Sequence, residues 1–213
     1  SGKRSRSSSK IQKMKGQKKM HLDYALARYL GDIAREQAED LGVPVSIAIA
    51  DVHGQTIFFG CMDNALPASP GIAQDKAYTA SVLRMSSEKL APLVQPGGDL
   101  YGIEQHLTHP IVVFGGGVPL WFGEQVAGAI GISGGTVQED VSIANRVVDC
   151  LQDMQRIAHT LRQNNNFLKI SSDIKDIHIM VKKVLKINYM DRDLSSKALA
   201  GGLYLALSSS ELR

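Results

Sequence analysis

The sequence predicts an α+β fold in which helices pack against one antiparallel β-sheet of about five strands. Two segments, residues 45–50 and 126–132, alternate larger apolar residues with small ones, a period of two that indicates β-strands. Glycine-containing turns at residues 51–54 and 122–125 join these segments to neighbouring strands, which is typical of hairpins. Because parallel strands need long crossovers, these short connections favour an antiparallel sheet.

Two helices are expected before the centre of the chain. Over residues 21–41, apolar residues recur at helical spacing, and Gly42 follows as a C-terminal cap. The next strand, residues 55–61, completes the first hairpin and leads through a loop to a helix over residues 72–85. Small residues occupy one face of this second helix, which favours close packing on the sheet: Ala73, Ala77 and Ala80.

A third helix, over residues 137–153, is expected to begin with a capping box. Thr136 and Glu139 have the spacing at which each side chain binds a free backbone N–H of the first turn. Gly134 and Gly135 precede this helix and could instead hold an anion at its N-terminus. The carboxylates of Glu139 and Asp140 would repel an anion, so capping is the favoured interpretation.

The middle of the chain contains a long irregular segment. Residues 86–110 are punctuated by proline and glycine, and a loop of this length in a compact domain is often functional. The apolar run at residues 111–114 is a candidate further strand, so that two or three strands follow the loop. A folded domain is therefore expected over residues 21–154, followed by a helical extension over residues 155–213.

The N-terminal residues differ in composition from the rest of the chain. Residues 1–20 contain eight Lys or Arg and no Asp or Glu. Such a segment buries too little apolar surface to offset its ordering entropy, so a disordered basic tail is expected. It has no aromatic residue for stacking on bases, so nucleic-acid binding is not expected. The rest of the chain holds 16 of the 24 basic residues and all 21 acidic ones, and is mildly acidic.

Two further features bear on cellular location. The chain has no apolar run long enough to cross a membrane and no apolar core of a secretory signal. Its two cysteines, Cys61 and Cys150, do not make a disulfide framework in a chain of this length. A cytoplasmic protein without a membrane partner is therefore expected.

Five motifs occur in a characteristic order: Leu41–Asp51 with Gly54, Met62–Ala65, Lys76–Ala80, Gly115–Leu120 and Gly128–Gly135. Taken together, they resemble the GlcG/HbpS-type haem-binding family. A narrower match, at residues 90–98 and 100–102, is similar to the C-terminal domain of PduO-type cobalamin adenosyltransferases. The adenosyltransferase domain itself has no counterpart, so no ATP or cobalamin chemistry is carried over.

The resemblance implies a profilin-like layered domain that assembles as dimers, and often octamers, with haem held between subunits. It also implies a place beside pathways for small diols or glycolate. Haem iron favours a neutral imidazole, and His21 stands close to the position of the ligand histidine in the PduO-type domain. His106 and His109 are further candidates, each alternatively a solvated surface residue. The glycines expected to line the cofactor or ligand site are Gly115, Gly116, Gly117, Gly134 and Gly135.

Three functions follow, and the first is preferred: a haem-binding or cofactor-handling accessory protein. The alternatives are an enzyme acting on a small ligand or on haem in the glycine-rich pocket, and a structural partner in a microcompartment-associated complex. No nucleophile–base pair, phosphate-binding loop or zinc spacing is present, which favours binding over catalysis. Residues 173–186 form an amphipathic segment that resembles helices directing proteins into bacterial microcompartments, where it would contact a shell protein. An ordinary helix docking on its own domain is the alternative.

Overall fold

The computed structural model describes residues 22–163, with side chains through Arg156. His21, the basic tail over residues 1–20 and the amphipathic segment at residues 173–186 lie outside the described residues. The main elements, in order, are α2 (Tyr24–Leu41), β1 (Ser46–Asp51), β2 (Thr56–Cys61), α3 (Ser69–Leu83), α4 (Ser87–Leu90), β3 (Gly117–Phe122), β4 (Gln125–Ser133) and α5 (Val137–Gln163). Two 3₁₀ helices, η2 (Ala91–Leu93) and η3 (Ile103–His106), lie between α4 and β3.

The sheet has the strand order β2-β1-β4-β3, and every neighbouring pair is antiparallel. In the central pair, Ile47 faces Ile132 and Ala48 faces Gly131. In both of these strands, the large side chains therefore point to one face of the sheet and the small ones to the other. The antiparallel α+β fold predicted from the sequence is confirmed.

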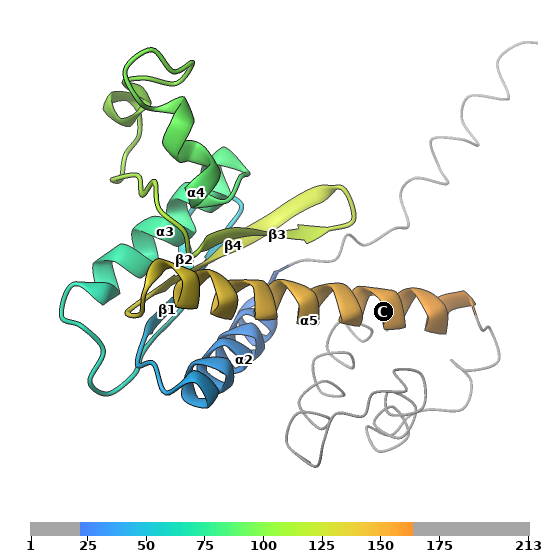
Figure 1. Ribbon diagram of the computed structural model, residues 1–213. Coiled ribbons are helices and arrows are strands. Elements are labelled where there is room, and N and C mark those ends of the chain that lie inside the picture. Colours follow the sequence, from blue (N-terminus) through green and yellow to red (C-terminus); the bar gives the residue numbers. More distant parts are fainter. Residues whose placement is uncertain (1–21, 164–213) are drawn as a thin grey trace, which may run out of the picture.

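Three layers result from this alternation (Figure 1). Helices α2 and α5 lie together on the face that carries the branched side chains, where Ile49, Ile130 and Ile132 are fully buried. Helix α3 covers the opposite face, where Ala48 and Ala50 pack against its alanines. The predicted small face of this helix is confirmed, since Ala73 and Ala77 are completely buried there.

The strand count is four rather than about five, because residues 111–114 are not a strand. Two side chains from neighbouring helices bind the backbone of this run. The Val112 N–H donates to Thr79 Oγ1 at 3.0 Å, and Ser87 Oγ donates to the Phe114 carbonyl at 2.7 Å. The run therefore joins the covering layer of α3 and α4 instead of the sheet.

The helix ends follow their capping residues. Asp23 accepts a hydrogen bond from the Leu26 N–H at 2.9 Å, and Gly42 closes α2 in the left-handed conformation at φ 70°. Helix α3 begins at Ser69, three residues earlier than predicted, with Pro70 in its first turn. Helix α5 continues to Gln163, beyond the predicted end of this helix at residue 153.

Within residues 22–163, the structure contains no helix with the length and apolar character needed to cross a membrane.

The closest approach between α3 and the sheet occurs at Gly131. A Cβ atom at this position would lie 2.0 Å from the Ala73 carbonyl oxygen and 2.5 Å from the Ala77 nitrogen. Because both neighbours are backbone atoms of a helix, Gly131→Ala is expected to lower the free energy of unfolding by about 3 kcal/mol. Urea denaturation followed by circular dichroism measures this change.

Gly71 provides the matched control, since it is exposed in the first turn of α3 with no atom within 4 Å of an added Cβ. Gly71→Ala is expected to raise the free energy of unfolding by about 0.5 kcal/mol, through helix propensity alone. Equal effects of the two substitutions would contradict the tight packing of α3 on β4.

Candidate functional site

A buried ion pair lies where the glycine-rich segments meet. Lys76 in α3 donates from Nζ to Asp140 Oδ2 in α5 at 2.7 Å, and the two side chains are 0% and 4% exposed. The same amine donates to the Ile132 carbonyl at the end of β4, also at 2.7 Å. Its Nζ lies 4.9 Å from the ring centroid of Phe114, a distance suited to a cation–π interaction. The amine thus joins α3, β4 and α5.

The glycine segment at residues 115–117 wraps around this amine. A Cβ atom at Gly116, where φ is 110°, would lie 2.8 Å from Lys76 Nζ and 2.7 Å from the Ile132 oxygen. At Gly117 it would lie 2.6 Å from the Lys76 carbonyl oxygen. Ser87 Oγ accepts from the Gly117 N–H at 3.0 Å and holds the segment from the other side. Glycine is required here because the backbone itself contacts the buried lysine.

The second glycine segment meets the same ion pair from the opposite direction. The Gly135 N–H donates to Asp140 Oδ1 at 3.1 Å, so this carboxylate has partners on both oxygens. At Gly134, where φ is 147°, an added Cβ would lie 2.5 Å from the Pro44 carbonyl oxygen. Three of the five predicted glycines, Gly116, Gly117 and Gly135, thus contact Lys76 or Asp140. Gly115 lies against Val137 and Val141 of α5, and Gly134 lies against Pro44 and Val45. The role of all five as cofactor contacts stays a prediction.

Burial shifts both members of the pair toward their neutral forms. It raises the pKa of the Asp140 carboxyl, while the hydrogen bond from Lys76 acts in the other direction. Burial likewise lowers the pKa of the Lys76 amine, against the opposing effect of Asp140. Two charges in such a position depend on each other, because removing one leaves the other buried without a counter-charge.

The capping box at the start of α5 is confirmed. Glu139 Oε2 accepts from the Thr136 N–H at 2.7 Å, and Thr136 Oγ1 accepts from the Glu139 N–H at 3.3 Å. These hydrogen bonds lower the pKa of Glu139 below its ordinary value of 4.5. Carboxylates therefore already bind the N–H groups of Gly135 and Thr136, and a hydroxyl binds that of Glu139.

Two of the predicted histidines, His106 and His109, lie in the long segment between α4 and β3. His106 ends η3, and His109 lies against Tyr78 with the ring centroids 4.8 Å apart. The Tyr78 hydroxyl also lies 3.1 Å from Thr108 Oγ1, so this aromatic contact holds the end of the long segment on α3. In the part of the chain that the structure describes, no three His, Cys, Asp or Glu residues form a metal-binding group.

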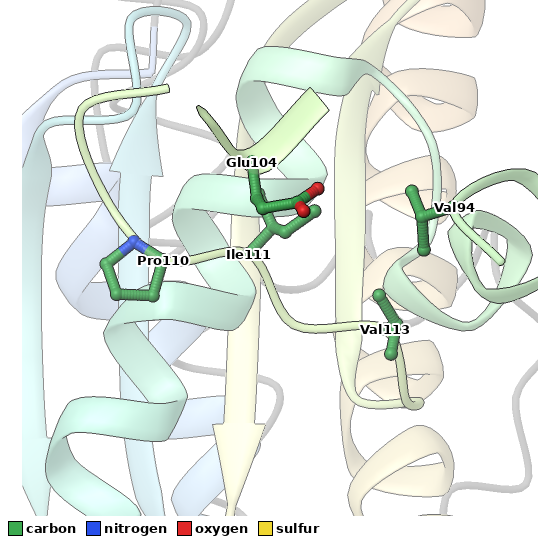
Figure 2. Close-up of a pocket in the computed structure, with 5 residues that line it drawn as sticks. All are labelled: Val94, Glu104, Pro110, Ile111 and Val113. Carbon is green, nitrogen blue, oxygen red and sulfur yellow. The ribbon is translucent and has the colours of Figure 1, made fainter. Parts of the chain in front are cut away.

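The long segment between α4 and β3 forms an open pocket of about 480 Å³ (Figure 2). Four of its lining residues are apolar and one, Glu104, carries a carboxylate. The apolar ones are Val94, Pro110, Ile111 and Val113. The sequence predicted a functional loop over residues 86–110, but not a pocket or its lining. The lining residues are separated in the sequence, and only the folded conformation of the segment brings them together.

The buried ion pair was missed by sequence reasoning. Lys76 and Asp140 belong to motifs that the sequence analysis used for the family resemblance or for capping, and neither was singled out as a buried charge. One signal was available, since Lys76 lies on the small-residue face of a helix between Ala73 and Ala80. A lysine on a face that packs against a sheet needs a buried partner.

Comparison with known proteins assigns the domain. The family model described as "Haem degrading protein HbpS-like" matches residues 22–149, well over half of the chain. The chain belongs to this HbpS-like family. An uncharacterised 15.0 kDa protein of the dhaT-dhaS intergenic region of Citrobacter freundii is 36% identical over 140 residues, which cover 66% of this chain and 99% of that protein.

Two further HbpS-like relatives bear on the narrower resemblance. The corrinoid adenosyltransferase PduO of Salmonella typhimurium is 42% identical over 115 residues, covering 54% of this chain but 34% of PduO. The crystal structure of a PduOC:heme complex aligns with a TM-score of 0.57 and 39% identity, covering 61% of this chain and 94% of that one. The recognition of the GlcG/HbpS-type family with a PduO C-terminal-like sequence is confirmed.

The buried ion pair predicts a specific pattern of stability changes. Lys76→Met leaves the Asp140 carboxylate buried without its cation and is expected to lower the free energy of unfolding by about 3–5 kcal/mol. The double variant Lys76→Met/Asp140→Leu removes both charges and is expected to recover most of that loss.

Arg35→Met is the control, because the side chains of the Arg35–Glu39 pair are 43% and 52% exposed. Loss of this exposed pair should change the free energy of unfolding by less than about 0.5 kcal/mol. A double variant less stable than Lys76→Met would contradict this account.

The capping box predicts a pH dependence. Because the folded protein lowers the pKa of Glu139, its carboxylate contributes stability that is present above the ordinary pKa of 4.5 and is lost as pH falls through the lower folded value. At neutral pH, the urea midpoint of the wild type should therefore be higher than that of Glu139→Gln. The difference between the two midpoints should shrink as the pH is lowered. A gap that stays constant with pH would show that ionisation of Glu139 contributes nothing.

Proposed function

We propose that this protein binds haem as an accessory protein of small-diol or glycolate catabolism, with the haem held between subunits of a homo-oligomer. The observation that carries the proposal is the alignment with the PduOC:heme complex, whose 39% identity extends over nearly all of that chain. The family description, which names haem degradation, supports the same ligand. The similarity to PduO supports the pathway.

His21 is the proposed iron ligand, because a neutral imidazole suits haem iron. The residues that follow His21 are firmly anchored. Leu22 is 1% exposed and contacts the position of Gly128 in β4, and Asp23 caps α2. His21 directly precedes this anchor in the sequence.

Exposed aromatic side chains near this anchor support a site completed by a second subunit. Tyr24, the first residue of α2, is 62% exposed, and Trp121 on the edge strand β3 is 40% exposed. Trp121 follows Leu120, which pairs with Gly128 in the sheet. A porphyrin offers two large apolar faces, and burial of such faces together with exposed aromatic residues is favourable. Dimers or octamers would supply the second wall.

The geometry favours binding over the enzymatic alternative in the glycine-rich region. An added Cβ at each of the five predicted glycines would meet protein atoms within about 3 Å, so protein atoms take up the space beside these positions. Location inside a bacterial microcompartment, with residues 173–186 contacting a shell protein, stays a prediction.

The haem proposal is tested by titrating the full chain with haemin and recording absorbance and light scattering. Wild type is expected to give a saturable, six-coordinate low-spin spectrum, and His21→Ala is expected to lose it. A smaller assembly in the His21→Ala variant would place this residue at a subunit interface.

His53→Ala is the matched control, because His53 is exposed in the turn between β1 and β2. His106→Ala and His109→Ala test the other candidate ligands in the same titration. If His21→Ala kept the low-spin spectrum, a residue other than His21 would be the iron ligand. Absence of saturable binding by wild type would overturn haem binding altogether.

A further inference from the structure

The pocket in the long segment has the form of a small-molecule site, and none of the proposed haem contacts is among the residues that line it. Its volume of about 480 Å³ lies within the range of known ligand pockets. Figure 2 shows the Glu104 side chain beside Ile111, with Val94 and Val113 across the opening. An apolar wall with one polar group is the usual composition of a site that orients a small ligand.

The walls of this pocket are held in place by separate contacts. One wall is fixed by the Leu100 N–H, which donates to the Leu93 carbonyl at 2.9 Å. The close approach of Gly98, where an added Cβ would lie 2.3 Å from the same oxygen, tightens that turn. The other wall is fixed to α3 through the hydrogen bond from Val112 to Thr79 at 3.0 Å. The pocket is therefore formed before any ligand arrives.

The charge of the region selects the kind of ligand. The long segment itself, residues 91–116, contains two acidic residues, Asp99 and Glu104, and no Lys or Arg. Among the residues that the structure describes, none forms an ion pair or hydrogen bond with the Glu104 carboxylate. A free carboxylate beside an apolar wall attracts a cation with an apolar body and repels anions.

We infer that this pocket binds a small organic cation, a protonated amine on a short alkyl body. The ammonium group pairs with the Glu104 carboxylate, and the alkyl chain covers Val94, Ile111 and Val113. The inference does not depend on haem binding, because none of the proposed haem contacts takes part in it.

The test uses n-butylammonium as the probe, with 1-butanol and butyrate as uncharged and anionic probes of the same length. Methyl resonances of Val94 and Val113 in the full chain report binding at this pocket. Saturable shifts with n-butylammonium, weaker ones with 1-butanol and none with butyrate are expected. Added salt should weaken the binding, because the carboxylate is exposed.

Glu104→Gln keeps the size of the side chain and removes its charge, so n-butylammonium affinity is expected to fall roughly fivefold. Glu124→Gln is the control, since Glu124 lies in the β3–β4 turn, away from the long segment (Figure 1). Equal affinities for n-butylammonium and 1-butanol, or unchanged affinity in Glu104→Gln, would overturn the inference. Haemin binding should be the same in both variants, which separates this result from failure of the haem proposal.

Discussion

The buried ion pair between Lys76 and Asp140 is the constraint on which the arrangement of this domain depends. The two residues come from helices on opposite faces of the sheet, and their 2.7 Å contact passes the end of β4. Two charges removed from water are tolerated only when their hydrogen bonds are satisfied. The Ile132 carbonyl and the Gly135 N–H meet that requirement, and the ring of Phe114 adds a cation–π contact. A side chain at Gly116 would clash with both the amine and the Ile132 carbonyl.

Everything between α3 and β3 follows from this packing. Because the glycine segment must wrap around the amine, the run before it is drawn away from the sheet and is bound by Thr79 and Ser87. The long segment from α4 to Pro110 then projects from the layered domain (Figure 1). The pocket with Glu104 lies in this segment, where the chain departs from the layered core.

The glycine segments lie within the layered domain that the HbpS-like match covers. Their backbone contacts neighbouring protein atoms, as at Gly116 beside Lys76 and Gly131 beside Ala73. The features available to ligands are at the periphery: the start of α2, the exposed aromatic residues of the edge strand, and the long segment. An oligomer can enclose a large cofactor at such positions without disturbing the ion pair.

The sequence by itself determined the local elements, because their causes are local. Alternation defined β1 and β4, Gly42 ended α2, and the spacing of Thr136 and Glu139 specified the cap of α5. Even the small face of α3 could be predicted, since period and side-chain size are visible in the chain. Tertiary structure alone decided that residues 111–114 lie outside the sheet, that His109 packs against Tyr78, and that Lys76 pairs with a carboxylate on another helix. Each of these outcomes depends on a contact between groups that are far apart in the sequence. A local sequence pattern does not show which distant groups will meet.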